Sequence, residues 1–217
     1  MKERLAILVP DGAYPLILEA LLTKRRRSLD LREVAREIIK DAFRDSSREV
    51  VALLRPYLRD CTHVLLLRDL EGSGAEERGA KVLEAELLDE LVENGWHKDR
   101  AAVLVVEPEV EAWLRFDSVH LRELVRERAR KRQDDAELLF PQVVADAIQA
   151  CGGSDQIGKP QRPKETLEML LKEFGVRRSN AIYGKLAERE GLRGCKQKSF
   201  QRLVTTLHNW FPGSDLA

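Results

Sequence analysis

The chain has 217 residues and little of what marks secreted, membrane or zinc-binding proteins. Its three cysteines, Cys61, Cys151 and Cys195, lie far apart and form no CxxC or paired CxxH spacing, which argues against a zinc knuckle or a redox pair. No apolar run approaches the roughly 18 residues that a membrane helix needs. The opening MKERLAILVP passes from charge into a short apolar run with no small-residue cleavage site after it. We therefore expect a reduced, cytoplasmic protein with no membrane partner.

The chain also lacks net charge, because 37 Lys and Arg balance 37 Asp and Glu. This balance removes the simplest argument for a nucleic-acid partner, a uniformly basic surface. The charges are unevenly placed, however: residues 1–120 hold 19 basic against 24 acidic residues, and the remainder holds 18 against 13. Residues 159–202 hold 12 basic against 5 acidic residues. Chance segregation is one explanation of this pattern; the other is a local basic region that binds phosphate.

Apolar patterning predicts strands alternating with helices in the first half of the chain. Short apolar runs predict buried strands at residues 5–9, 63–67 and 101–106. Apolar residues at helical spacing predict helices after Pro15 and at residues 31–42, 50–58 and 75–93. This order predicts an α/β fold with a mainly parallel sheet flanked by helices. After Trp113 the pattern is helical, at residues 119–129, 138–150, 164–174, 180–190 and 196–210. We expect an α/β domain over 1–117 and a basic helical region over 118–217.

Acidic residues follow each of the three predicted strands. They are Asp11, then Asp69 and Glu71, then Glu107, Glu109 and Glu111. Neighbouring parallel strands are about 4.8 Å apart, so their acidic ends would converge around one or two hard cations. Carboxylates that close would repel one another unless a cation or a basic group neutralised them. The pattern therefore predicts a Mg²⁺ or Mn²⁺ site, although polar loops and acidic helix starts explain any single position equally well.

Two local patterns refine this expectation. Asp69 and Glu71 are two residues apart in an extended segment, so their side chains are expected to face the same metal. Pro108 is expected to begin a helix, which would place Glu107 and Glu111 on one face.

These residues resemble a known family. A strand followed by Asp11 and Gly12, and a second strand followed by the DxE of Asp69 and Glu71, resemble the Toprim domain. That domain is a Mg²⁺-binding α/β fold shared by topoisomerases, primases and overcoming-lysogenization-defect nucleases. The segments HVLLLRDLEGSG, GWHKDRAAVLVVEPEVEAWL, KPQRPKETLEMLL and KSFQRL more narrowly resemble small Toprim-like bacterial proteins of phage-defence gene clusters, including methylation-associated ones. The resemblance covers most of the chain.

The resemblance implies a nuclease that cleaves phosphodiester bonds of nucleic acid, with DNA as the expected substrate. It implies that Asp69 and Glu71 hold the cation, and the full set of expected ligands is Asp11, Asp69, Glu71, Glu109 and Glu111. The expected catalytic residues are Asp11, as general base or acid, and Glu111, with Lys164 and Lys185 as phosphate contacts. Asp11 stands where the Toprim pattern has Glu, and Glu71 replaces the second Asp of DxD.

Two other functions remain open. The change at Asp11 favours a catalytically weak Toprim-like binding or regulatory subunit that acts with other proteins of a defence complex. The segment LLLRDLEGSG alternatively resembles a haloacid-dehalogenase-type phosphatase, with Asp69 as nucleophile. His63 is expected to be a core residue, and Trp113 and Trp210 are expected to be core anchors, with base stacking as the alternative for the two tryptophans.

Overall fold

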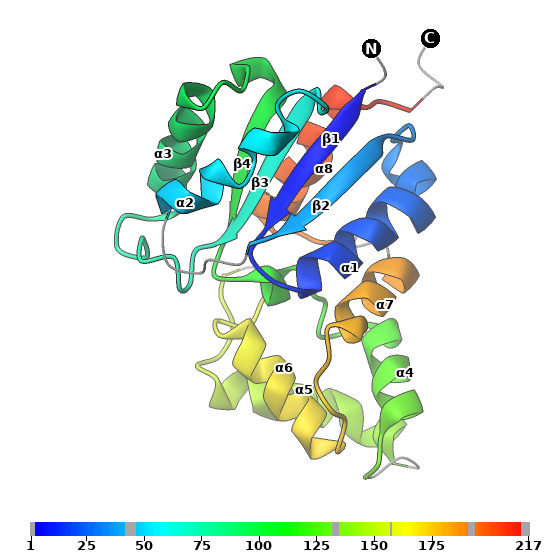
Figure 1. Ribbon diagram of the computed structural model, residues 1–217. Helices are drawn as coiled ribbons and strands as arrows, with labels where there is room; N and C mark the ends of the chain where they lie inside the picture. Colours follow the sequence, from blue (N-terminus) through cyan, green and yellow to red (C-terminus); the bar gives the residue numbers. More distant parts are fainter. Residues whose placement is uncertain (1–2, 42–46, 132–134, 157, 191–193, 214–217) are drawn as a thin grey trace.

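The computed structural model describes residues 3–41, 47–131, 135–156, 158–190 and 194–213. Four parallel strands form its single named sheet in the order β2-β1-β3-β4. They are β1 (Arg4–Val9), β2 (Ala35–Lys40), β3 (His63–Asp69) and β4 (Ala101–Val106). Helices cover both faces of this sheet, as Figure 1 shows. The predicted α/β class and the three predicted strands are therefore confirmed.

The edge strand β2 replaces a predicted helix. Residues 31–42 have apolar side chains at helical spacing, but Ala35–Lys40 pairs in parallel with β1 along the whole length of that strand. The apolar residues Ile38 and Ile39 fit either structure. Pairing prevails because the ladder satisfies backbone groups along the outer edge of β1, and a gain of that kind outweighs a weak intrinsic preference for helix.

Two other predicted helices are shorter than expected. Residues 50–58 divide between α2 (Ser47–Ala52) and a 3-10 turn (Arg55–Tyr57). The predicted helix at residues 75–93 begins only at Ala80, as α3 (Ala80–Glu93), after Gly79 with a φ of 83°. Turns over residues 70–78 therefore separate β3 from α3.

The sheet lies between two helical layers because side chains along its strands alternate between its faces. Ile7 and Leu65 pack with α1 (Ala13–Glu19) and α8 (Lys198–Trp210) on one face. Leu66 and Val103 pack with α2 and α3 on the other face. A π-helical turn (Ala20–Lys24) and a 3-10 turn (Arg26–Leu29) continue α1 towards β2. Both faces of the central strands are therefore buried, as their continuous apolar runs predict.

Four further helices gather beyond the carboxyl ends of the strands (Figure 1). They are α4 (Val119–Arg128), α5 (Ala136–Ala150), α6 (Pro163–Glu173) and α7 (Ala181–Glu190), and together with α8 they confirm the five helices predicted after Trp113. The expected domain boundary at residue 117 falls just before α4. Helix α7 packs on α1 and α8 packs on β4, so one hydrophobic core includes residues from both sides of that boundary. Among the described helices, none combines the length and apolar character needed to cross a membrane.

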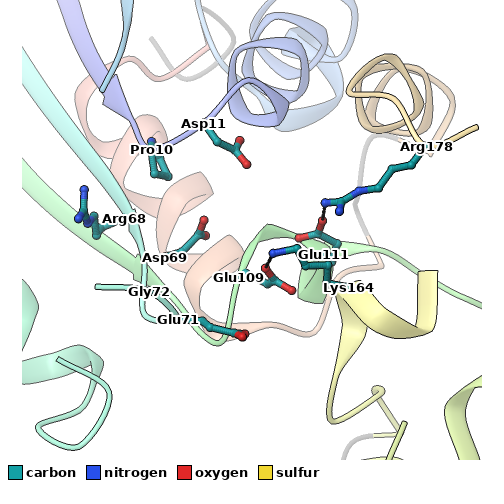
Figure 2. Close-up of a pocket in the computed structure, with 10 residues that line it drawn as sticks. All are labelled: Pro10, Asp11, Arg68, Asp69, Glu71, Gly72, Glu109, Glu111, Lys164 and Arg178. Atoms are coloured by element: carbon teal, nitrogen blue, oxygen red, sulfur yellow. Dashed lines mark hydrogen bonds and ion pairs between the residues drawn. The ribbon is translucent and has the colours of Figure 1, made fainter. Parts of the chain in front are cut away.

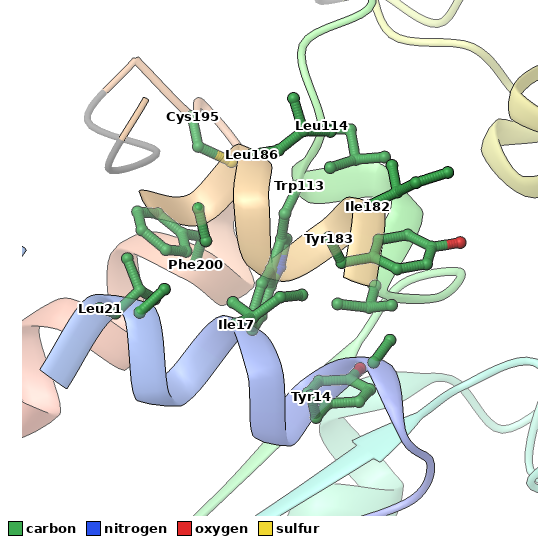
Figure 3. Close-up of a cluster of buried hydrophobic side chains, with 14 of the residues drawn as sticks. Tyr14, Ile17, Leu21, Trp113, Leu114, Ile182, Tyr183, Leu186, Cys195 and Phe200 are labelled. Carbon is green, nitrogen blue, oxygen red and sulfur yellow. The ribbon is translucent and has the colours of Figure 1, made fainter. Parts of the chain in front are cut away.

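Trp113 anchors the segment that follows β4. It ends a 3-10 turn, η5 (Val110–Trp113), and its ring is fully buried between Tyr14 of α1 and Phe200 of α8, at centroid distances of 5.8 and 5.4 Å (Figure 3). Its indole Nε1 donates a hydrogen bond to Ser199 Oγ at 2.9 Å. Trp113 is therefore a core anchor, as predicted, and it holds η5 at the carboxyl ends of the strands.

Candidate active site

A cavity of about 520 Å³ lies at the carboxyl ends of the strands, and we call it the carboxylate cavity. Its lining residues are Pro10, Asp11, Arg68, Asp69, Glu71, Gly72, Glu109, Glu111, Lys164 and Arg178 (Figure 2). All five carboxylates predicted to bind metal line it. They end or follow β1, β3 and β4, whereas Lys164 and Arg178 come from the helical part. The cavity therefore lies between the sheet and the helices beyond it.

Three of the carboxylates, Asp11, Asp69 and Glu71, follow or end β1 and β3, and we call them the sheet-end carboxylates. Asp11 Oδ1 accepts a hydrogen bond from the backbone N–H of Ala13 at 2.8 Å. Asp69 ends β3, and the hydroxyl of the fully buried Tyr14 donates to its Oδ1. No ion pair involves these three side chains in the described part of the chain.

The backbone after β3 directs Glu71 into the cavity. The N–H of Leu70 donates to Val106 O at 2.9 Å, and the N–H of Glu71 donates to Pro108 O at 3.0 Å, so pairing with the β4 segment continues beyond the strand. The Leu70 side chain is buried, while Asp69 and Glu71 both line the cavity. The expectation that the DxE carboxylates face the same side is therefore confirmed.

The segment after β4 is not the predicted helix. Glu109 is extended, with φ −157° and ψ 176°, and the 3-10 turn starts only at Val110. Glu109 and Glu111 are buried and line the cavity, whereas Glu107 is exposed and does not. The prediction that Glu107 and Glu111 share one helical face is wrong, because this segment has no regular helical repeat.

Glu109 and Glu111 each form an ion pair with a basic side chain from the helical part, and we call them the paired carboxylates. Lys164, in the first turn of α6, donates from Nζ to Glu109 Oε2 at 2.9 Å. Arg178 Nη2 donates to Glu111 Oε1 at 2.8 Å, and the Tyr183 hydroxyl donates to the same oxygen at 2.5 Å. These contacts connect η5 with α6, with α7 and with the segment between them.

Of the two predicted phosphate contacts, only one lies in the carboxylate cavity. The structure also places at this cavity residues that were not predicted from the sequence. Lys164 lies in the cavity, but Lys185 is on the exposed side of α7 and is not among the lining residues. Arg178 was missed because nothing in its sequence context distinguishes it from the neighbouring Arg177. Tyr183 was missed because its partner Glu111 is 72 residues away. Tyr14 was detectable, since it lies only three residues after Asp11, just before a predicted helix.

Burial and crowding make the cavity electrostatically unusual. The pKa of Asp69 is raised to about 8, chiefly by burial and then by nearby carboxylates, although the hydrogen bond from Tyr14 opposes the rise. The pKa of Glu109 is raised to about 7 by burial and by Glu111, and Lys164 opposes this rise. The same ion pair raises the pKa of Lys164. Negative charge at this end of the sheet is therefore only partly compensated.

A count of charges supports this conclusion. Five carboxylates and three basic side chains line the cavity. One of the basic residues, Arg68, forms a buried ion pair with Asp41 at 2.8 Å. Lys164 and Arg178 remain, and Arg178 also forms an ion pair with Glu168 outside the cavity. The raised pKa values leave Asp69 and Glu109 partly protonated near pH 7, but acidic charge in the cavity still exceeds basic charge.

The donor groups suit a hard divalent cation in kind and in charge. All are carboxylate oxygens, which Mg²⁺ and Mn²⁺ prefer, and Glu109 Oε1 is buried with no hydrogen-bond partner among the described atoms. In the arrangement that the structure describes, no three His, Cys, Asp or Glu side chains form a group that could hold a metal ion. Binding of a cation would therefore require the sheet-end carboxylates to turn towards a common point.

Comparison with known proteins assigns no function to the chain. The chain matches no protein-family model, and no curated protein or solved structure is significantly similar to it. Parallel α/β folds support many unrelated reactions, so the fold alone assigns none. What the protein does must be inferred from the chemistry of its own cavity.

Proposed function

We propose that the protein is a Mg²⁺- or Mn²⁺-dependent nuclease that hydrolyses phosphodiester bonds of nucleic acid. One observation carries this proposal: five carboxylates from three adjacent strand ends face two basic side chains from the helical part across one cavity. A phosphodiester is an anion that reacts when its charge is neutralised and a water molecule is activated next to it. Carboxylates that bind a cation and basic groups that bind phosphate supply these two requirements.

The sheet-end carboxylates are assigned to the metal and to proton transfer. Asp69 and Glu71, with Asp11 and Glu109, would hold the cation, which when bound polarises a phosphoryl oxygen and lowers the pKa of water. Tyr14 fixes the orientation of Asp69 through its hydrogen bond. Asp11 uses Oδ1 to accept the Ala13 N–H, which leaves Oδ2 to accept a proton from the attacking water.

Lys164 and Arg178 are assigned to the phosphate. Their side chains are 42% and 37% exposed, so solvent and substrate reach them even while they bind Glu109 and Glu111. The planar guanidinium of Arg178 has paired N–H donors that match two phosphate oxygens, although Nη1 is paired with Glu168 and Nη2 with Glu111 in this structure. A bound phosphate would compete with Glu109 for Lys164, and with Glu111 and Glu168 for Arg178.

The wider assignment depends on the motif resemblance. Because the order of strand ends and acidic residues resembles Toprim-like proteins of phage-defence clusters, we assign the protein to that class, with DNA as substrate, a role in bacterial antiviral defence and a cytoplasmic location. The parallel sheet with its acidic carboxyl end is consistent with a Toprim-like domain. The helical part, where basic residues exceed acidic ones, is the expected site of DNA contact.

The nuclease proposal is tested with Glu71→Ala. Glu71 is exposed and forms no ion pair among the described residues, so the variant should keep its circular dichroism spectrum and melting temperature. We expect it to lose Mn²⁺-dependent nicking of plasmid DNA. The matched control is Glu77→Ala, which removes an exposed acidic residue outside the cavity and should cleave like the wild type. Undiminished nicking by Glu71→Ala would refute the assignment, and turnover of p-nitrophenyl phosphate would favour the phosphatase alternative.

A second candidate function is a binding or regulatory subunit of a multi-protein defence complex. The specific observation in its favour is that Glu109 and Glu111 are already neutralised by Lys164 and Arg178, and no three-residue metal group is formed among the described side chains. The presence of Asp11 in place of Glu points the same way. Calorimetry showing no Mg²⁺ or Mn²⁺ binding, together with co-purification with the product of a neighbouring gene, would favour this function over the nuclease.

A further inference from the structure

A second cavity, of about 780 Å³, lies at the other end of the sheet, and we call it the arginine cavity. Its lining residues are Glu3, Arg32, Thr62, His63, Arg100, Asn209 and Trp210. His63 begins β3, whose last residue is Asp69 of the carboxylate cavity. Six residue steps of about 3.3 Å place the two cavities about 20 Å apart along this strand. In Figure 1, the start of β1 and the end of α8 meet at this end of the molecule.

The arginine cavity carries unbalanced positive charge. Arg32 and Arg100 are opposed by the single carboxylate of Glu3. Arg32 is held by an ion pair with Glu3 and by its position over the Phe211 ring, 5.3 Å from the ring centroid. Arg100 is exposed, and its side chain has no hydrogen bond or ion pair within the described ranges. One guanidinium therefore faces the cavity with its donors unused, a group suited to an oxyanion.

His63 supplies a hydrogen-bond acceptor to the same cavity. Its Nδ1 lies 3.0 Å from Thr62 Oγ1, and that hydroxyl donates to Arg4 O at 3.0 Å. With the single hydroxyl hydrogen of Thr62 assigned to Arg4 O, the contact with Thr62 Oγ1 assigns a proton to His63 Nδ1. Burial, Arg100 and Arg32 all lower the pKa of His63, which keeps the ring neutral. A neutral ring protonated on Nδ1 leaves Nε2 as an acceptor.

Aromatic and amide groups complete the lining. The Trp210 ring lies 5.0 Å from the His63 ring and is held by a hydrogen bond from its Nε1 to Asp99 O at 3.3 Å. Trp210 is half-buried, so it is only partly the core anchor that was predicted. Asn209 is exposed and offers an amide with both donor and acceptor groups. A flat aromatic ligand could contact Trp210 while its polar edge meets Asn209 and His63.

We propose that the arginine cavity binds a nucleotide, with its phosphate at Arg100 and its base against Trp210. A phosphate needs the unused guanidinium, a base needs an aromatic face, and its N–H groups need an acceptor such as His63 Nε2. The cavity volume lies within the range of about 300–1,000 Å³ typical of small-molecule sites. This site is separate from the proposed nuclease site and stands whether or not the protein cleaves DNA. The nucleotide is either free or the terminal nucleotide of a strand.

Calorimetry on the full chain tests this proposal with AMP as the probe. We expect saturable binding of AMP that is tighter than binding of adenosine or of inorganic phosphate, because each fragment makes only part of the contacts. Arg100→Ala should weaken AMP binding by roughly tenfold, the effect of losing a charge-assisted hydrogen bond. Asn209→Ala should weaken it less. Both residues are exposed, so the variants should fold, and circular dichroism checks this.

The matched control is Arg59→Ala, which removes an exposed arginine that lines neither cavity and should bind AMP like the wild type. No saturable binding of AMP, GMP, CMP or UMP would overturn the proposal, as would equal affinities of Arg100→Ala and Arg59→Ala. Loss of AMP binding in Lys164→Ala but not in Arg100→Ala would place the nucleotide in the carboxylate cavity and overturn it too. Tighter binding of a 5′-phosphorylated dinucleotide than of AMP assigns the site to a strand end, and otherwise it takes a free nucleotide.

Discussion

The two ends of β3 carry opposite charge, and each end compensates only part of it. In the carboxylate cavity, Lys164 and Arg178 neutralise the paired carboxylates, while the sheet-end carboxylates have no basic partner among the described side chains. In the arginine cavity, Glu3 neutralises Arg32 while Arg100 has no such partner there. The uncompensated groups differ in sign, so the first end favours a cation and the second an anion.

The two ends cannot neutralise each other. Two unit charges about 20 Å apart attract by only about 0.8 kcal/mol at an effective dielectric constant of about 20, against about 4 kcal/mol at 4 Å. The middle of β3 between them, residues 64–68, is buried. Each end therefore requires a counter-charge of its own, from within the chain or from a ligand. Substitutions at each end should separate the charges whose pairing stabilises the fold from the charges that are available to a ligand.

The largest expected effect is on stability, from the loss of a paired carboxylate. Glu111 is 3% exposed and accepts hydrogen bonds from Arg178 and Tyr183. Glu111→Ala leaves both donors without this acceptor and should lower the free energy of unfolding by about 3 kcal/mol, measured by urea denaturation. The control is Glu71→Ala, a sheet-end variant expected to change stability by less than about 0.5 kcal/mol. Equal effects of the two variants would remove the distinction between paired and sheet-end carboxylates.

A smaller effect is expected from the removal of one uncompensated charge. Asp69→Asn keeps the acceptor oxygen for Tyr14 but removes a negative charge from a crowded cavity. In EDTA at pH 8 we expect its melting temperature to exceed that of the wild type by about 2–4 °C, which corresponds to about 1 kcal/mol for a chain of this size. Mg²⁺ should raise the melting temperature of the wild type and not that of the variant. Asp89→Asn, on the exposed face of α3, is the control and should respond to Mg²⁺ like the wild type. A Mg²⁺ response that survives in Asp69→Asn would contradict a metal role for this residue.

The smallest expected effect is a pH dependence at the opposite end of β3. The pKa of His63 is lowered in the folded protein, so as pH falls below about 6.5 the unfolded chain takes up the proton first. Stability that is present above this pH is therefore lost as the pH falls towards the folded pKa. Urea denaturation at pH 7.5 and at pH 5 should show a larger loss for the wild type than for His63→Gln. The same loss in both proteins would show that His63 is not the group responsible.

The strands that could be predicted from the sequence are those whose burial leaves a clear pattern in a short stretch of chain. Strands β1, β3 and β4 are buried on both faces, so each appears in the sequence as an uninterrupted apolar run. Strand β2 is an edge strand, as β4 is, but its side chains are partly exposed where nearly all of those of β4 are buried, so they leave a pattern equally consistent with a helix. Its conformation is decided by pairing with β1, a contact that begins 31 residues earlier in the chain, at Arg4↔Ala35.

The residues of the candidate site also fall into those that could be predicted from the sequence and those that could not. Asp11, Asp69 and Glu71 could be predicted to lie together because parallel strands must place their carboxyl ends along one edge. The choice of Glu109 over Glu107 could not be predicted, because it depends on an extended residue and a 3-10 turn that Trp113 holds between two helices. Lys185 was predicted at the site from charge alone, and charge does not say which side of a helix faces the cavity.

The sequence by itself determined the parallel sheet, the acidic edge and the helical part that follows, because each leaves a pattern in a short stretch of chain. A strand buried on both faces appears as an apolar run, and a helix between two strands is the crossover that parallel strands need. Only the tertiary structure decided which charges are compensated. Arg178 reaches Glu111 across 67 residues, and Arg32, His63, Arg100 and Trp210 meet at one cavity although each belongs to a different element or loop. Electrostatic energy depends on the distance between groups in space, and packing of the whole chain sets that distance.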